Sequence, residues 1–383
     1  MKRAPWLALL ALAGCDAVEP WVSERPTAPP FAPIACVEVA ECALFDELTV
    51  GNPGGGISSP EPRCADGLVA RSLAVAGDTR IDAASLACTD VTIAIEDGDT
   101  PLVLTVEGDA LAAVHLRVRS TSRPVELRLE ARVVEDAIVE GDGPISLTAT
   151  GAGFERSRLE VRASRAVTTP VLRIEGGAHQ DLAIALPIGA LRLDDAEVER
   201  AHLDVEQLAS RRGELVASTV RAELADLIAV ELADTTLEVL ELAAGGGDWR
   251  SVELARCDAL LLSRVQLESS RLAACEGPVW LEEVQAERSA FAGDVHGTDG
   301  YYLECAFAGE SVELGSRIHR SAFCGVARID ARQLICVRCE PDAPPDVCAL
   351  VEGDTALCPG VCHATCEDGA LWFGGQACRA PDA

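Results

Sequence analysis

The fold is decided by the stretch that begins with Val91-Thr-Ile-Ala-Ile95 and continues with Leu102-Val-Leu-Thr-Val106, Val114-His-Leu-Arg-Val118 and Val125-Glu-Leu-Arg-Leu129. In each run an aliphatic side chain occupies every second position, and this period of two indicates a β-strand with one buried face. Runs of the same kind recur at short intervals as far as Val205. Many short strands in succession are typical of a sandwich, a barrel or a solenoid.

Two features favour the solenoid. The sole aromatic residue between Leu68 and Gly247 is Phe154, whereas sandwich cores usually contain large aromatic side chains. The later half also holds loose variants of one unit, which begin at Leu193, Leu232, Leu254 and Ile318. We therefore predict an all-β fold, a right-handed parallel β-helix (β-solenoid) over residues 63–335, in which each coil stacks its aliphatic side chains on those of the next.

Two other interpretations stay open. Asp97-Gly98 and Asp142-Gly143 are good hairpin turn pairs, which would suit antiparallel strands and make residues 65–190 a β-sandwich. The stretch from Glu206 to Ala244 is rich in Ala, Glu, Leu and Arg and could be helical on propensity, although its recurrent Val and Thr favour strands. A wide interval in the strand rhythm predicts a further, weaker strand near Ile138.

The first residues have the composition of an export signal. Lys2 and Arg3 precede a short apolar run that ends at Leu12. The motif Leu12-Ala13-Gly14-Cys15 matches the lipobox, so residues 1–14 resemble the signal peptides of bacterial lipoproteins. This resemblance implies cleavage before Cys15 and attachment of acyl chains such as palmitate to that residue. We expect a lipid-anchored protein of the cell envelope, in the outer membrane or at the cell surface rather than in the inner membrane.

Both flanks of the predicted solenoid differ from it in composition. Residues 15–62 are rich in proline and contain the run Gly54-Gly55-Gly56, which predicts an extended linker behind the lipidated Cys15. Residues 336–383 hold seven cysteines and few residues that could form a core. So short a segment needs crosslinks or a metal to stay folded, which predicts a small Cys-rich tail module. The body itself resembles right-handed parallel β-helix surface proteins.

Cysteine usage follows from export, because an oxidising compartment favours disulfides. Cys36 and Cys42 lie near enough in sequence to close a small loop, while zinc is the alternative for the tail, where His363 stands among the cysteines. Four further cysteines fall at intervals of 18, 30 and 19 residues, which could place some of them in adjacent coils: Cys257, Cys275, Cys305 and Cys324. The other candidate disulfide cysteines are Cys36, Cys42, Cys64, Cys88, Cys336, Cys339, Cys348, Cys358, Cys362, Cys366 and Cys378.

The charge balance excludes several classes of function. The chain has 62 acidic and 32 basic residues, and its only lysine is Lys2. A surface with this excess of negative charge repels phosphate backbones, so we expect no nucleic-acid partner. Without a lysine in the body there is also no amine for Schiff-base chemistry and no P-loop.

Acidic, imidazole and aromatic side chains occur close together at Asp294, His296 and Asp299, which precede Tyr301 and Tyr302. Asp294 and His296 share a face if this segment is extended, so these three polar residues are the weak catalytic candidates. Motifs of serine hydrolases, zinc proteases and dinucleotide enzymes are missing from the sequence. No cofactor is expected, and calcium is the one candidate ion, at the acidic segments 96–99 and 140–143.

These observations lead to three hypotheses about function. The first is a lipid-anchored envelope protein with a structural, adhesive or binding role and no catalysis, whose partners are the membrane and an envelope protein or polysaccharide. The alternative is a carbohydrate-active enzyme, a polysaccharide hydrolase or lyase that uses the acidic residues near 294–299 on a β-helix scaffold. The third is a module that binds a partner through the tail, residues 336–383.

Overall fold

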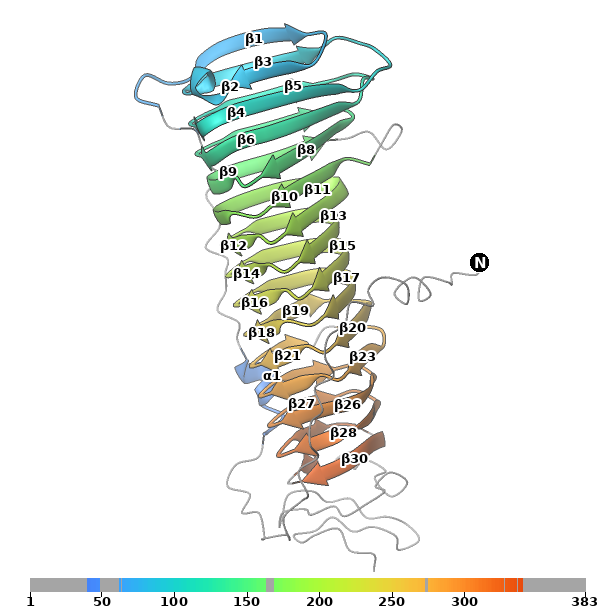
Figure 1. Cartoon of the computed structure of the whole chain (residues 1–383). Coiled ribbons are helices and arrows are strands. Elements are labelled where there is room, and N and C mark those ends of the chain that lie inside the picture. Colours follow the sequence, from blue (N-terminus) through green and yellow to red (C-terminus); the bar gives the residue numbers. More distant parts are fainter. Residues whose placement is uncertain are drawn as a thin grey trace, which may run out of the picture. The chain divides into compact units, whose positions relative to one another are not determined.

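The computed structural model describes residues 40–48, 62, 64–162, 169–272, 275–326, 328–335 and 337–339. Its internal contacts divide the chain into Met1–Ala35 and Cys36–Ala383, and every described residue belongs to the second part. The described residues form a parallel β-solenoid of about 13 turns with almost no helix (Figure 1). The prediction of a parallel β-solenoid is therefore confirmed.

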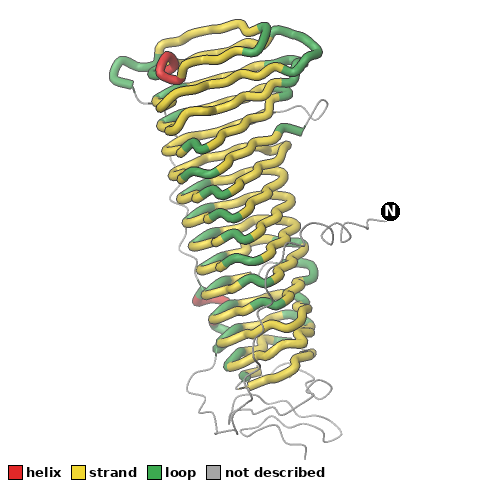
Figure 2. The backbone as a smooth tube through the Cα atoms, in the orientation of Figure 1, coloured by secondary structure: helices red, strands yellow, loops and turns green. Residues whose placement is uncertain are grey.

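Each coil contributes strands to three faces, and strands inside the stack pair in parallel with those of the coils before and after them (Figure 2). The first face is made by β1 (Val69–Val75), β3 (Thr89–Ile95), β5 (His115–Arg119), β7 (Ile138–Asp142), β19 (Glu253–Arg256), β22 (Arg271–Leu272), β25 (Ala290–Ala292), β27 (Ala306–Ala308), β29 (Ala322–Cys324) and β31 (Arg338–Cys339). The second face contains β2 (Thr79–Asp82), β8 (Ile145–Thr150), β10 (Val171–Glu175), β20 (Ala259–Ser263) and β23 (Val279–Glu282). The third contains β12 (Glu197–Glu199), β14 (Glu214–Val216), β16 (Glu231–Ala233), β18 (Asp248–Arg250), β21 (Gln266–Glu268) and β24 (Gln285–Glu287).

The remaining strands run around a corner and serve two or three faces. They are β4 (Leu102–Ala112), β6 (Val125–Glu135), β9 (Gly153–Arg162), β11 (Ala178–Asp194), β13 (His202–Arg211), β15 (Thr219–Ile228), β17 (Thr236–Gly245), β26 (Val295–Leu303), β28 (Ser311–His319) and β30 (Arg328–Ile335). The described helices are α1 (Leu44–Glu47) and the short 3-10 helix η1 (Ala83–Leu86). Successive coils repeat every 17 residues between Ala201 and Thr235 and every 16 residues after Gly300.

The core is a set of columns in which one buried side chain lies on the next along the stack. One column of the second face joins twelve buried positions in register: Leu104, Leu127, Leu147, Leu172, Leu191, Leu208, Ala225, Leu242, Leu260, Val279, Val295 and Val312. Because alternate side chains of a strand point to opposite sides, this column accounts for the aliphatic alternation in the sequence. Near the end of the stack, the rings of Phe291, Phe307 and Phe323 stack in the same way on the first face.

One residue with positive φ turns the chain from the third face to the first in each coil. These residues are Cys88, Ala113, Asp136, Arg156, Asp181, Arg200, Ala217, Asp234, Ser251, Ser269, Arg288, Glu304 and Arg320, with φ between 46° and 55°. A left-handed conformation costs an L-residue about 1–2 kcal/mol. The corner N–H offsets this cost because it hydrogen-bonds to a carbonyl of the next coil, as from Ala217 to Ala233 at 2.9 Å. The backbone ladder therefore continues around the corner.

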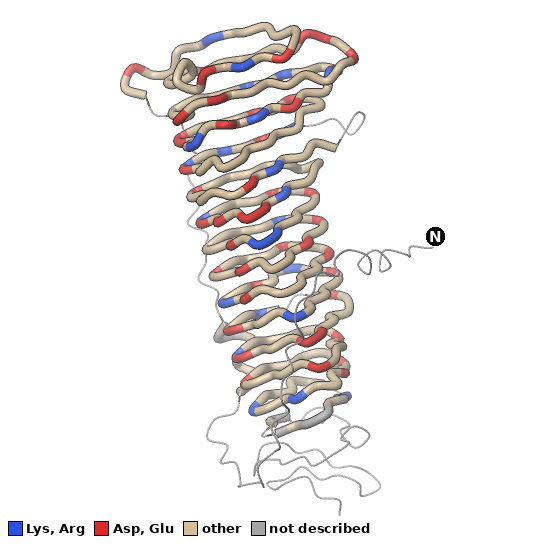
Figure 3. Tube along the Cα trace, viewed as in Figure 1, with Lys and Arg blue, Asp and Glu red and all other residues tan. Residues whose placement is uncertain are grey.

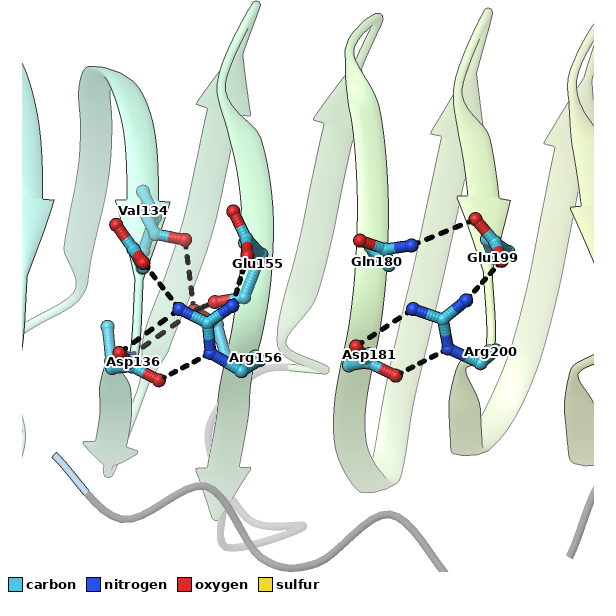
Figure 4. A network of polar contacts seen from close by, with 11 residues as sticks. Val134, Asp136, Glu155, Arg156, Gln180, Asp181, Glu199 and Arg200 are labelled. Carbon is cyan, nitrogen blue, oxygen red and sulfur yellow. Dashed lines mark hydrogen bonds and ion pairs between the residues drawn. The ribbon is translucent and has the colours of Figure 1, made fainter. Parts of the chain in front are cut away.

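Corner residues of neighbouring coils also pair by charge (Figure 4). Arg156 Nε lies 2.8 Å from Asp136 Oδ1, and Arg200 Nε lies 2.8 Å from Asp181 Oδ1. Arg212 and Asp195 form the same pair at the corner between the second and third faces. These side chains are partly exposed, so each pair adds little free energy, but opposite charges at equivalent positions favour the observed register.

A row of buried hydroxyl groups follows the corner just inside the core. Ser218 Oγ donates to Val216 O at 2.8 Å and accepts from Ala201 N of the preceding coil at 3.0 Å. Ser270, Ser289 and Ser321 make equivalent contacts. Serine fits here because a small side chain can satisfy the buried backbone groups of two coils at once.

Three disulfides join described residues. Cys257–Cys275 bridges adjacent coils, with the Cα atoms 4.4 Å apart. Cys64–Cys88 fastens the chain before the first coil. Cys42 pairs with Cys324 on β29, so the predicted small loop with Cys36 is wrong. Cys36 itself lies outside the described residues, as do Cys15, Cys336, Cys348, Cys358, Cys362, Cys366, Cys378 and His363, whereas Cys339 ends β31.

The Cys42–Cys324 bond brings an early segment against a late coil. Ala40 N also donates to Arg320 O at 3.0 Å, so residues 40–48, within the range predicted as linker, contact the solenoid. Cys88 and Cys324 are separated by the twelve successive strand pairings of the first face from β3 to β29. Two points only 22 residues apart in sequence, Cys42 and Cys64, are thus attached to coils far apart along the stack.

The β-sandwich alternative for residues 65–190 is wrong, because all strand pairs there are parallel. Asp142-Gly143 carries the chain from β7 to β8 on a different face, and Asp97-Gly98 lies between β3 and β4, so neither pair closes a hairpin. The helical interpretation of Glu206 to Ala244 is also wrong, since this stretch forms β13 to β17. The weaker strand expected near Ile138 is β7.

Replacing Cys42 and Cys324 together by serine removes the crosslink of longest range among the described disulfides, with a sequence separation of 282. We expect the free energy of unfolding to fall by about 2–4 kcal/mol, because the crosslink restricts the unfolded chain. Guanidinium unfolding measures this loss, and hydrogen exchange should place it in the coils around β29. The matched control replaces Cys257 and Cys275, which are 18 residues apart. An equal loss in both double variants would contradict this account.

Candidate functional site

The three polar residues singled out in the sequence lie around β26, but they do not form one cluster. Asp294 precedes the strand, and its Oδ1 accepts from Ser311 N at 3.2 Å. His296 points outward from the second face. Asp299, with φ 55°, turns the chain toward the third face. The partner of His296 is a carboxylate that the sequence reasoning missed, that of Glu313 on the next coil.

The aromatic residues of this segment separate in the same way. Tyr302, Phe291 and Phe307 are buried in the core, where the tyrosine ring packs edge-on against both phenylalanines. Tyr301 points outward on the third face, and its ring meets that of His319 with centroids 5.1 Å apart. The expected acid, imidazole and aromatic constellation is therefore divided between the core and two outer faces.

His296 belongs instead to a row of outward side chains on the second face. Leu261, Trp280, His296 and Glu313 occupy equivalent positions on β20, β23, β26 and β28, which follow one another along the stack (Figure 1). The Trp280 and His296 rings stack with centroids 4.9 Å apart and an angle of 28° between their planes. Successive strands lie about 4.8 Å apart, so the ring spacing is set by the backbone.

Charged side chains lie at the Glu313 end of this row. His296 Nδ1 lies 3.3 Å from Glu313 Oε2, and Arg328 lies 3.1 Å from Glu313 Oε1. Trp280 remains 51% exposed despite its stacking contact. An indole that is ordered by its neighbours and still open to solvent is suited to binding, because little side-chain freedom remains to be lost.

Apolar side chains extend this surface toward the middle of the stack. Leu224 and Ile228 of β15 are exposed on either side of Asp226, which is in register with Ala243 of β17 and, through it, with Leu261. Among the described residues, three of the six large hydrophobic side chains that are exposed lie on this face. We call the surface made by Leu224, Ile228, Ala243, Leu261, Trp280 and His296 the Trp280 platform.

The third face carries two shallow grooves. One, of about 240 Å³, runs past Gln266, Gln285 and Tyr301, with Arg250 and Glu268 on its other side. The other, of about 590 Å³, lies near His179, Glu197 and Glu214. Both are lined by side chains at regular coil intervals, and neither brings an acid, a base and a nucleophile together as a hydrolytic site requires.

The candidate calcium segments are engaged by protein donors. Asp97 Oδ1 accepts from Thr121 and Ser122, and Glu140 lies 3.5 Å from Arg117. In the described part of the chain, no group of three or more His, Cys, Asp or Glu side chains could hold a metal ion. Within the same residues, no helix is long and apolar enough to cross a membrane.

Searches with the whole chain found no matching family model, no matching curated protein and no matching solved structure.

Two buried titratable groups belong to the packing. Burial raises the pKa of the Cys305 thiol to about 12, and this free cysteine occupies the position that Ser289 and Ser321 hold in adjacent coils. His179 is enclosed beside Phe154, and burial lowers its pKa although a hydrogen bond to Gly176 O opposes the shift. Its Nδ1 accepts from Phe154 N at 3.3 Å, so the structure favours the neutral imidazole.

The neutral state of His179 predicts a pH dependence of stability. Its pKa is lower in the folded state, so below about pH 6.5 the unfolded chain binds a proton that the folded chain does not. The free energy of unfolding should therefore fall as the pH decreases from 7.5 to 5.5, and His179→Gln should reduce this dependence. Denaturant unfolding at both pH values measures it, with the exposed His202→Gln as control. An unchanged pH dependence in His179→Gln would refute the assignment.

Proposed function

We propose that this chain is a lipid-anchored protein of the cell envelope that binds an envelope component and has no catalytic activity. The Trp280 platform carries the binding part of the proposal, because it is an ordered apolar surface left open on a scaffold of continuous strands. Exposed apolar patches with polar surroundings are typical of interaction sites. The lipobox supports the anchor, since acylation of Cys15 would hold the chain at a membrane.

The solenoid suits such a role for a further reason. Residue 40 is fastened to a late coil by the Ala40–Arg320 hydrogen bond and the neighbouring Cys42–Cys324 disulfide. Residues 40–48 therefore join the folded body at the late coils, and β1 lies at the opposite end of the stack. The platform, on β15 to β26, occupies intermediate coils. Acidic and basic residues are distributed along the whole stack (Figure 3), which favours solubility.

The anchor is tested by replacing the acylated residue. In a detergent phase separation of bacteria that express the full chain, we expect the native protein in the detergent phase and Cys15→Ser in the aqueous phase, because each buried methylene contributes about 0.8 kcal/mol to membrane binding. Cys305→Ser controls for loss of a thiol, since serine already occupies its position in neighbouring coils. Native protein in the aqueous phase would overturn the anchoring.

The absence of catalysis is tested with acidic and neutral polysaccharides and the Cys15→Ser chain. We expect no new reducing ends and no unsaturated products. Turnover that is abolished by Asp294→Ala or His296→Ala would support the carbohydrate-active enzyme instead. The tail hypothesis makes a different prediction: deletion of residues 336–383 would remove binding while the solenoid signal in circular dichroism persists.

A further inference from the structure

We infer that the Trp280 platform binds an uncharged polysaccharide that lies along the coils. This inference rests on the proposed function and names the class of its ligand. Two properties of the surface carry it: the ordered aromatic and aliphatic side chains, and the carboxylates that lie among and around them.

Short side chains separate the large ones of the platform. Ala243, Gly245 and Ser263 leave the backbone of β17 and β20 open to close approach, while Leu261 and Trp280 continue the surface along the stack. The apolar C–H face of a sugar ring can lie against such a surface and against the exposed indole. A polymer with repeated rings can contact successive coils, whereas a single small ligand would leave most of the surface uncovered.

The surrounding charges determine which polymer fits. Asp226 is exposed within the platform between Leu224 and Ile228, Glu241 and Glu282 are exposed beside it, and none of the three has an ion-pair partner among the described side chains. Carboxylates accept hydrogen bonds from the hydroxyl groups of a sugar, and they can do so at a surface that stays partly hydrated. The same carboxylates outnumber Arg211, the exposed cation in register with Ile228, and they repel uronic acids and sulfated sugars, so the ligand is uncharged.

These carboxylates disfavour a folded protein surface or a second copy of this chain. A dry protein interface would bury them without partners, which costs more free energy than the apolar contact returns. A second copy would bring its own Asp226, Glu241 and Glu282 toward the first set, and like charges at an interface suppress association. A glycan avoids both costs because its hydroxyl groups pair with the carboxylates and water fills the remaining space.

Affinity gel electrophoresis of the Cys15→Ser chain tests the inference, with gels that contain dextran, galactomannan, hydroxyethyl cellulose, alginate or polygalacturonate. We expect at least one uncharged polymer to retard the protein and neither anionic polymer to do so. The retardation by the uncharged polymer should persist at high salt. Trp280→Ala should weaken binding about tenfold or more, as truncation of a central aromatic anchor does. Trp280→Phe should retain part of the affinity. Tyr301→Ala, which removes an exposed aromatic ring from the third face, is the matched control.

Retardation by no uncharged polymer, by anionic polymers alone, or to the same extent with and without Trp280 would overturn the inference. Circular dichroism and the unfolding midpoint confirm that each variant is folded, and Trp280→Phe provides the measurement if Trp280→Ala is not. The proposed function fails separately, if the native chain is not held in the detergent phase or if polysaccharide is cleaved. Loss of glycan binding with an intact anchor would refute only the ligand class.

Discussion

The structure depends on a parallel backbone hydrogen-bond ladder that does not stop at the corners. Because single residues with positive φ keep their N–H groups directed at the next coil, every coil can lie in register on its neighbour. Register then brings aliphatic side chains into continuous columns and buries them. The hydroxyl row and the Asp–Arg pairs follow from the same repetition, since equivalent positions in neighbouring coils always meet. Outward side chains of neighbouring coils are in register as well, and the stacking of the Trp280 and His296 rings is one result.

The fold could be predicted because the core obeys a short period. Alternation at Val91, Ile93 and Ile95 indicates a strand even when the strand that pairs with it is unknown. The scarcity of aromatic residues between Leu68 and Gly247 argues against a sandwich. The prediction of hairpin turns failed because Asp-Gly and Gly-rich pairs occur at corners between faces as well as in antiparallel turns. The helical interpretation of Glu206 to Ala244 failed because burial in register outweighs weak intrinsic propensity.

The candidate site was harder to predict because its members come from different coils. The sequence suggested a site at Asp294, His296 and Asp299 because these residues are neighbours along the chain. In the structure, the side chains that contact His296 are those of Trp280 and Glu313. They lie one coil before and one coil after it, and the coil length varies between 16 and 19 residues in this part of the chain. With the coil length known, the sequence alone would be enough to align Leu261, Trp280, His296 and Glu313 as equivalent positions of successive coils. The early pairing of Cys42 with Cys324 has no such signal, since it joins an element outside the repeat.

The paired attachment of Cys42 and Cys64 sets a ceiling on how long this solenoid can become. A fully extended chain of 22 residues spans at most about 73–79 Å. The twelve strand pairings between the two anchoring coils occupy about 58 Å. Duplication of coils is the simplest way for a repeat protein to evolve, and roughly three or four extra coils would exhaust the reach of the segment between these cysteines. Further growth would require that segment to lengthen as well, so the two disulfides and the segment between them limit the number of coils.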